Sequence, residues 1–282
     1  MIEAPSAIRD LLADATRRLR SAAVDQPERE SGWIWEKLTG RSRVSSITGA
    51  SEPVSEREVL EFQAAISRRL QGEPLAHVLG ESAFRYLLVG SDRRALIPRP
   101  ETEGLVDLVL ERQGFGTVVD IGTGSGCIAL SLASEGDYDL VVAVERSSVA
   151  RGLAQANITR SGLPVTLIAG DLSSSLGSAS VDILVSNPPY LSDAEYAALT
   201  PEVKDWEPEL ALRSGTDGLG TTRTILADGL RVVRPGGWLV LEIDCSRAAQ
   251  VTEAAIRTGW VDVLVKDDLF GRARYLVARR SE

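Results

Sequence analysis

The sequence is poor in the residues that build disulfide frameworks and metal centres. Its 282 residues include two cysteines and one histidine. Cys127 and Cys245 have neither metal-ligand spacing nor disulfide spacing, and two thiols in a chain of this length fit a reducing compartment. We therefore expect no metal site, and we interpret both cysteines as packing residues.

Long apolar runs are missing as well. No stretch approaches the roughly 20 apolar residues that a membrane-spanning helix needs. Residues 1–6 show no basic segment followed by an apolar one, which a secretory signal would require. The sequence thus predicts a cytoplasmic protein that does not act at a membrane.

The chain also lacks an excess of positive charge. The chain has 31 Lys and Arg residues against 40 Asp and Glu residues, for a net charge of -9. Residues 1–76 carry 11 basic and 12 acidic side chains, so nearly all of the acidic excess lies in residues 77–282. This balance disfavours a direct nucleic-acid substrate and suits a cationic cofactor better.

The composition is otherwise that of a globular protein, in a chain long enough for two domains. Apolar residues recur at helical spacing from Ala7 to about Leu70. Within that stretch, residues 39–53 are rich in Gly, Ser and Thr and are expected to form a loop, and residues 55–58 have a capping-box pattern. We expect residues 1–76 to form a small helical domain of a monomeric protein.

Strand-like runs follow the helical region. Residues 77–98 contain three short β-like runs, 77–80, 83–89 and 94–97, which favour a β-hairpin connector. From residue 99 to residue 282, strand-like and helix-like runs alternate. The strand-like runs are 117–121, 140–144, 165–169, 181–186, 238–243, 261–265 and 273–278. This alternation is typical of an α/β fold with a seven-stranded, mainly parallel, Rossmann-like sheet.

A glycine turn follows the first of these strands. The turn reads Asp120-Ile-Gly-Thr-Gly-Ser-Gly126, and a helix-like run begins at Cys127. Strand, glycine turn and helix together form the context in which backbone N–H groups bind a nucleoside cofactor. A dinucleotide fingerprint would require glycine at position 127, so the turn favours S-adenosyl-L-methionine. The turn residues expected to hold this cofactor are Asp120, Gly122, Thr123, Gly124, Ser125 and Gly126.

Acidic residues follow the next two strands. Glu145 ends the second strand, about 20 residues beyond the glycine turn, where a carboxylate can accept both hydrogen bonds of a ribose diol. Asp171 follows the third strand, and we expect it, with Leu172, to lie near the adenine. Three elements at three successive strand ends predict an adenosyl-cofactor site.

The fourth strand leads into Asn187-Pro188-Pro189-Tyr190, our candidate catalytic segment. The two prolines hold the backbone extended and leave carbonyl acceptors without competing N–H groups. An amide or aromatic amino nitrogen is a poor nucleophile, and the Asn187 side chain and the Pro188 carbonyl can bind both of its hydrogens. We expect Tyr190 to stack on the planar group and Asn187 to contact the cofactor too. These residues leave open whether the substrate is an adenine or a glutamine.

Further motifs carry a family resemblance. They are Leu96-Ile-Pro-Arg-Pro-Glu-Thr-Glu103, Val119-Asp-Ile-Gly-Thr-Gly-Ser-Gly-Cys-Ile-Ala-Leu130, Trp206-Glu-Pro-Glu-Leu-Ala-Leu212 and Asp268-Leu-Phe-Gly-Arg272. Together with Asn-Pro-Pro-Tyr, they resemble the glutamine-N5 methyltransferases of peptide-chain release factors, the HemK/PrmC family, over nearly the whole chain. One departure is Glu242-Ile-Asp-Cys-Ser-Arg247, where the family usually has Glu-Ile-Gly and a Gln-Gly pair.

The resemblance implies an enzyme that methylates the glutamine of a Gly-Gly-Gln motif in release factors and so modulates translation termination. It implies that the Asn-Pro-Pro-Tyr segment binds this glutamine and that the N-terminal helical domain helps to hold the release factor. It also implies a substrate pocket lined by Phe84, Arg99, Glu101 and Thr102. Three alternatives are a ribosomal-protein glutamine methyltransferase, a nucleic-acid adenine methyltransferase and a cofactor-binding module without catalysis.

Overall fold

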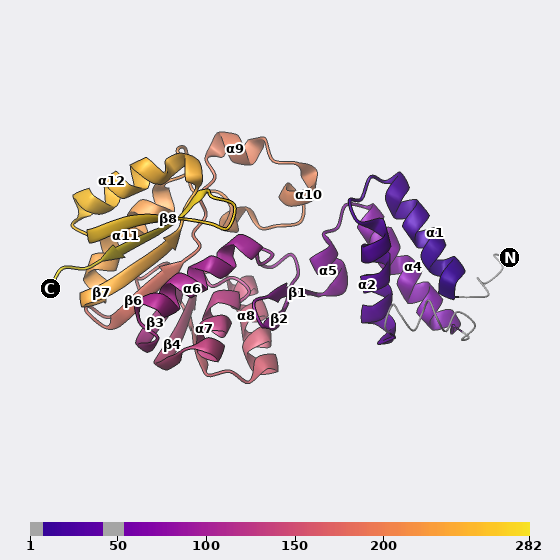
Figure 1. Ribbon diagram of the computed structural model, residues 1–282, viewed down its shortest axis with the longest axis horizontal. Helices are drawn as coiled ribbons and strands as arrows, with labels where there is room; N and C mark the ends of the chain where they lie inside the picture. The colour runs from indigo at the N-terminus through magenta and orange to yellow at the C-terminus, as the bar shows by residue number, and fades with distance from the viewer. Residues whose placement is uncertain (1–7, 42–53) are drawn as a thin grey trace. The chain divides into compact units, whose positions relative to one another are not determined.

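The chain forms two compact units. The structure is a computed structural model that describes residues 8–41 and 54–282. One unit ends at Gly80, and the other extends from Glu81 to Glu282 (Figure 1). The division falls shortly after the expected boundary at residue 76, and it leaves the β-hairpin in the second unit.

Helices build the first unit. They are α1 (Ile8–Ser21), α2 (Pro27–Thr39), α4 (Glu56–Leu70) and α5 (Leu75–Leu79). The capping box that the sequence predicts at the start of α4 is present, with the side chains of Ser55 and Glu58 each accepting a hydrogen bond from the other residue's backbone N–H. Thr39 is the last residue of α2, and most of the predicted loop, residues 42–53, lies outside the described residues.

An aromatic pair lies at the centre of this helical core. The rings of Trp35 and Phe62 meet edge to face, with centroids 5.5 Å apart and planes at 84°. Both side chains are almost completely buried, and they pack among Ile8, Leu19 and Ile66. Such an arrangement stabilises a core through both buried area and ring electrostatics.

We predict that Trp35→Ala destabilises this unit far more than Trp33→Ala does. Trp35 is 0% exposed and Trp33 is 45% exposed, although both belong to α2. Loss of the buried ring is expected to reduce the free energy of unfolding by about 3–5 kcal/mol, and loss of the exposed ring by less than about 1 kcal/mol. Urea unfolding followed by circular dichroism measures both values. Equal losses for the two variants would contradict the packing described here.

The expected hairpin is present, but only residues 81–90 form it. Strand β1 (Glu81–Phe84) pairs antiparallel with β2 (Leu87–Gly90). The run 77–80, predicted as strand-like, is instead the end of α5 and its C-cap. Pro74 precedes this helix, and Gly80 ends it with a left-handed φ of 72°. A five-residue helix is too short for its periodicity to be recognised.

The prediction of a strand at residues 94–97 is also wrong. The Asp92 carboxylate accepts the Arg94 backbone N–H at 3.0 Å, which closes a local turn. The Ile97 N–H donates to the Glu207 carboxylate at 3.2 Å. These backbone donors are therefore satisfied by side chains, and no strand in the described part of the chain pairs with the segment.

A seven-stranded sheet forms the centre of the second unit, as the sequence predicts. Its strands are β3 (Phe115–Ile121), β4 (Asp137–Glu145), β5 (Val165–Ala169), β6 (Val181–Ser186), β7 (Val233–Glu242), β8 (Val261–Asp267) and β9 (Ala273–Arg279). The order across the sheet is β5-β4-β3-β6-β7-β9-β8, and β9 runs antiparallel to the other six strands. The order reverses between β3 and β6, so a crevice is expected at the carboxyl ends of these strands.

Helices cover both faces of the sheet. They are α6 (Glu103–Arg112), α7 (Cys127–Glu135), α8 (Ser148–Ser161), α11 (Gly220–Val232) and α12 (Ala248–Thr258), with the short α9 (Asp193–Ala197) and α10 (Pro201–Lys204) in the connection after β6 (Figure 1). Side chains alternate along β3, so that Val118 packs with α6 and α7 while Val119 packs with α11 and α12. No helix within the described ranges is both long and apolar enough to cross a membrane.

Candidate active site

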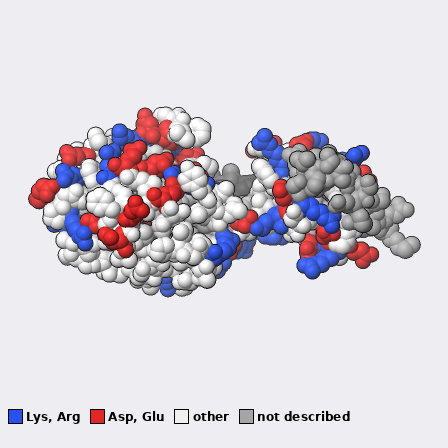
Figure 2. All heavy atoms as spheres, turned by 60° about the horizontal axis from the view of Figure 1, so that its bottom comes forward, with Lys and Arg blue, Asp and Glu red and all other residues white. Residues whose placement is uncertain are grey.

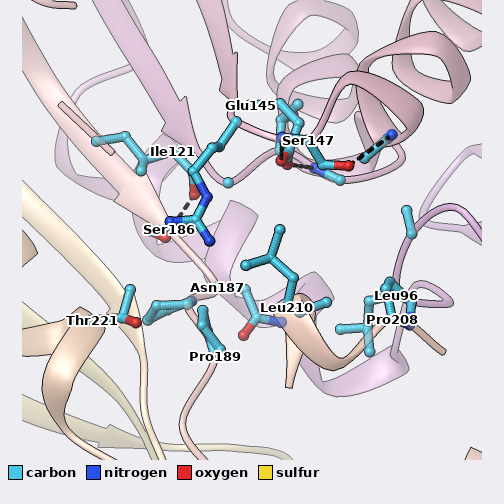
Figure 3. Close-up of a pocket in the computed structure, with 18 of the residues that line it drawn as sticks. Leu96, Ile121, Glu145, Ser147, Ser186, Asn187, Pro189, Pro208, Leu210 and Thr221 are labelled. Carbon is cyan, nitrogen blue, oxygen red and sulfur yellow. Dashed lines mark hydrogen bonds between the residues drawn. The ribbon is translucent and has the colours of Figure 1, made fainter. Parts of the chain in front are cut away.

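A crevice of about 610 Å³ opens at the carboxyl ends of the parallel strands (Figure 3). Its walls come from the ends of β3, β4, β5 and β6 and from two segments, residues 94–102 and 208–224. All of the lining residues belong to the Glu81–Glu282 unit. This is the edge at which open α/β sheets bind their ligands.

The glycine turn forms one wall of the crevice. Gly122, Gly124 and Gly126 all have positive φ values, of 71°, 57° and 87°. Gly126 is the N-cap of α7, so the turn passes directly into a helix N-terminus. A Cβ at Gly122 would meet no other atom within 4 Å, which leaves the backbone open to a ligand. Of the expected turn residues, 122–125 line the crevice.

The Glu145 carboxylate lies opposite this turn at the end of β4 and is labelled in Figure 3. One of its oxygens accepts the Gly124 N–H at 3.0 Å, and the other accepts the Ser147 N–H at 2.8 Å. Each carboxylate oxygen has a second lone pair, so both can accept a further hydrogen bond. The two hydrogen bonds therefore hold the Glu145 side chain in place, and each oxygen can still accept one more.

Asp171 and Leu172 lie in the crevice wall that follows β5. The Asp171 side chain is 60% exposed and pairs with Arg146 at 3.3 Å. Arg146, which belongs to none of the predicted motifs, also lines the crevice. An exposed pair of this kind contributes little to stability, so both side chains are available to a ligand.

Asp120 does not line the crevice but lies buried at the end of β3, 1% exposed. The Thr123 hydroxyl donates to its Oδ2 at 2.5 Å. Its Oδ1 is buried and has no hydrogen-bond partner among the described residues. Burial raises the pKa of this carboxyl to about 7.

The candidate catalytic segment reaches the crevice with three of its four residues. Asn187, Pro188 and Pro189 line it, and the preceding Ser186 ties β6 to β3 through a 2.7 Å hydrogen bond to a backbone carbonyl. The structure does not bring Tyr190 into the wall. Burial raises the pKa of its phenol to about 12, so this group stays neutral near pH 7.

Two of the four residues expected in the substrate pocket lie in the crevice. Arg99 and Thr102 line it, and Arg99 forms an ion pair with the buried Glu207. The prediction for Phe84 is wrong. Its ring is 0% exposed and packs in the hydrophobic core beneath α6 and α7, so it cannot form the pocket wall. Glu101 does not line the crevice either, and its backbone carbonyl accepts the Tyr275 hydroxyl.

Several further side chains at or beside the crevice belong to the family motifs quoted above but carry no role that those motifs predict. The Glu207 carboxylate accepts hydrogen bonds from the Ile97 N–H and the Arg99 side chain and so holds this part of the wall. Pro208 and Leu210 line the same side of the crevice. Glu242 ends β7 and accepts a hydrogen bond from Thr102 at 2.7 Å. Glu242 could have been noticed because it is an acidic residue at the end of an apolar strand, and that strand lies beside the one that leads to Asn187.

The loop after β7 is ordered although Asp244 stands where the family resemblance leads one to expect glycine. Asp244 has φ of -72° and ψ of 130°, which any residue adopts, and its carboxylate accepts the Ser246 N–H at 2.7 Å. Arg247 donates to the Asp217 carbonyl at 2.9 Å and forms an ion pair with Glu195. Glycine is therefore not required at this position.

Comparison with solved structures supports the fold. A methyltransferase from Pyrococcus furiosus matches with a TM-score of 0.55 and 20% identity, over 77% of this chain and 98% of that one. The catalytic domain of hMettl16, solved in complex with MAT2A 3'UTR hairpin 6, matches with a TM-score of 0.56 and 18% identity, over 80% of this chain and 82% of that one. The Methyltransferase small domain model matches residues 102–203. The fold and the crevice define an S-adenosylmethionine-dependent methyltransferase.

Sequence relatives identify the family. The PrmC N-terminal domain model matches residues 10–80. A Release factor glutamine methyltransferase from Deinococcus radiodurans is 39% identical over 277 residues, covering 97% of this chain and 99% of the relative. Another from Nitratidesulfovibrio vulgaris is 38% identical over 281 residues, covering 97% and 95%. The chain belongs to the release factor glutamine methyltransferase family.

Proposed function

We propose that this enzyme transfers a methyl group from S-adenosyl-L-methionine to the side-chain amide nitrogen, N5, of the glutamine in the Gly-Gly-Gln motif of peptide-chain release factors, and so modulates translation termination. The observation that carries the proposal is that Asn187 and Pro188 line the same crevice as Glu145 and the glycine turn. The names of the relatives support the release factor as substrate.

The Asn-Pro-Pro segment offers what a glutamine amide needs. An amide nitrogen is a poor nucleophile because its lone pair is delocalised into the carbonyl group. In our proposal, the Asn187 side-chain carbonyl and the Pro188 backbone carbonyl accept the two N–H hydrogens and direct the lone pair toward the methyl group. Pro189 contributes no competing N–H. Since Tyr190 does not line the crevice, we assign it to holding this segment rather than to stacking on the substrate.

The crevice residues fit S-adenosylmethionine. The unused lone pairs of Glu145 suit the two ribose hydroxyls. Asp120 is buried behind the glycine turn and holds it through the Thr123 hydroxyl, so its part in cofactor binding is indirect. Asp171 and Leu172 would flank the adenine. When bound, the cofactor would supply its methyl group: the sulfur–carbon bond would break as the nitrogen–carbon bond forms, S-adenosylhomocysteine would leave, and the amide nitrogen would lose one proton to water.

We assign release-factor binding to the N-terminal helical unit and propose that a monomer acts in the cytoplasm. The match of residues 10–80 to the PrmC N-terminal domain supports the first assignment. On the face of the Glu81–Glu282 unit shown in Figure 2, acidic side chains gather and basic ones are scattered among them. This pattern does not favour a nucleic-acid backbone as partner.

Transfer of labelled methyl groups tests the proposal directly. We expect label from S-adenosylmethionine on a purified release factor and none on its Gly-Gly-Ala variant. An adenine-containing DNA and RNA serve as controls, and purified ribosomal proteins form a third arm. Label that appears only on nucleic acid or only on a ribosomal protein would contradict the proposed substrate. No label on any of them would contradict the proposed reaction.

A further inference from the structure

A chain of hydrogen bonds connects the side chain of Asn187 to a buried carboxyl group. The Asn187 Nδ2 donates to the Thr102 hydroxyl at 3.0 Å, and the Thr102 hydroxyl donates to the Glu242 Oε2 at 2.7 Å. Thr102 is 3% exposed and Glu242 is 2% exposed. The three residues come from the segment after β6, from the turn at residues 100–102 and from the end of β7.

The chemistry of the three groups determines which one donates in each of these two hydrogen bonds. An ionised carboxylate can only accept hydrogen bonds, so the single hydroxyl hydrogen of Thr102 is used on Glu242. The Thr102 oxygen then has only lone pairs to offer to Asn187. The amide of Asn187 must therefore present its NH₂ group to Thr102, and its Oδ1, on the other side of the planar amide, is left for the crevice.

Within residues 8–41 and 54–282, no other hydrogen bond is recorded for the Asn187 side-chain amide. Among the described residues, none donates a hydrogen bond to Oδ1 of Asn187. Asn187 lies between Pro189 and Leu210 in the crevice, and these neighbours offer the amide apolar side chains (Figure 3). An amide flip would leave the shape of the pocket unchanged but would place a donor where the substrate N–H groups need an acceptor.

We infer that Thr102 and Glu242 are positioning residues that hold the Asn187 amide with its oxygen toward the nitrogen to be methylated. The inference rests on the proposed function, because an acceptor is needed at this point only if the substrate presents N–H groups. It adds Glu242 to the machinery of the reaction and gives Thr102 a defined role in place of general pocket lining.

The direction of the hydrogen bonds from Asn187 through Thr102 to Glu242 depends on whether Glu242 is ionised. Burial raises the pKa of Glu242 to about 7, while the Thr102 hydrogen bond and nearby Arg274 oppose the shift. The other charged or titratable groups that act on Glu242, or on which it acts, are Glu101, Arg99, Tyr190 and Tyr275. Once protonated, Glu242 can donate to Thr102, and Thr102 can then donate to Oδ1 of a flipped Asn187.

Removal of the Thr102 hydroxyl is the first test. In Thr102→Val the shape is kept but Asn187 loses its acceptor, so we expect kcat for a release factor to fall about 10-fold or more. Thr102→Ser keeps the hydroxyl and is expected to stay within about threefold of the wild type. Affinity for S-adenosylhomocysteine should be unchanged in both variants, which also shows that they are folded. Thr252→Val removes a hydroxyl that binds only an α12 carbonyl and serves as the matched control.

The pH profile is the second test, and a merely structural role for Glu242 would not change it. For a group with a pKa of about 7 that must be ionised, kcat at saturating cofactor should fall about tenfold from pH 8 to pH 6. In Glu242→Gln the side chain can still accept from Thr102 but cannot titrate, so we expect a flat profile over this range. Titration of Asp120, whose pKa is also near 7, is distinguished because it should affect cofactor affinity rather than kcat.

The outcomes separate this inference from the proposed function. A wild-type enzyme that methylates the release factor, together with Thr102→Val at wild-type kcat or Glu242→Gln with an unchanged pH profile, would overturn the positioning role alone. A wild-type enzyme that does not methylate the release factor would overturn the proposed function itself.

Discussion

Asn187→Ala is expected to lose at least about 100-fold in kcat, by analogy with the loss of one preorganised polar group from an active site. The substitution removes the only side-chain acceptor of the Asn-Pro-Pro-Tyr segment that lines the crevice. The substrate amide would then keep a single acceptor, the Pro188 carbonyl, and its lone pair would no longer be directed. Single-turnover transfer of labelled methyl to a release factor measures the loss.

Cofactor binding should survive the same substitution. The turn at Gly124 and the acid at Glu145 are intact in this variant, so the dissociation constant for S-adenosylhomocysteine should change by less than about threefold. Gln155→Ala removes an exposed amide from α8 and should leave both quantities unchanged. Wild-type turnover by Asn187→Ala would show that the segment does not orient the substrate. A large loss of cofactor affinity would assign Asn187 mainly to the cofactor site.

The sheet could be predicted because its strands are mainly apolar runs, and those at its centre, such as β3 and β6, are largely buried. Such strands appear in the sequence as continuous apolar runs, and the predicted bounds of β5 and β6 agree with the structure at both ends. The predicted β7 began at residue 238, whereas the strand begins at Val233 and includes Pro235 and Gly236. Turn-forming residues inside a strand conceal its start, since they are usually signals of a loop.

The residues expected to bind the cofactor could be predicted from local sequence, whereas the other residues of the crevice could not. The glycine turn, Glu145 and Asp171 each follow a strand directly, so the parallel sheet alone brings them to one edge. Glu242 and Glu207 act on residues more than 100 positions away in the sequence, through contacts that only the tertiary structure defines. Phe84 was misassigned because an aromatic residue in a hairpin has the same sequence pattern whether it faces the core or a ligand.

Glu145→Ala should weaken cofactor binding by at least about 100-fold, because two hydrogen bonds to a carboxylate are lost at once and each is worth about 1.5–3 kcal/mol. In the structure this carboxylate also accepts a hydrogen bond from the Gly124 N–H. The substitution therefore removes a hydrogen bond that holds the glycine turn, in addition to the acceptor for the ribose hydroxyls. Calorimetric titration with S-adenosylmethionine measures the change. At saturating cofactor, kcat should be affected much less than the KM for S-adenosylmethionine, since Glu145 does not contact the reacting nitrogen in our proposal.

Two further variants separate the lost hydrogen bonds from general effects of charge. Glu145→Gln keeps the shape, but its NH₂ group must face either the Gly124 N–H or the Ser147 N–H, so we expect a loss close to that of alanine. Glu253→Ala removes an acid from α12 whose side chain is 72% exposed, and should bind the cofactor as the wild type does. If Glu145→Gln bound as tightly as the wild type, the ribose assignment would fail, because a fixed pair of acceptors would not be needed at the end of β4.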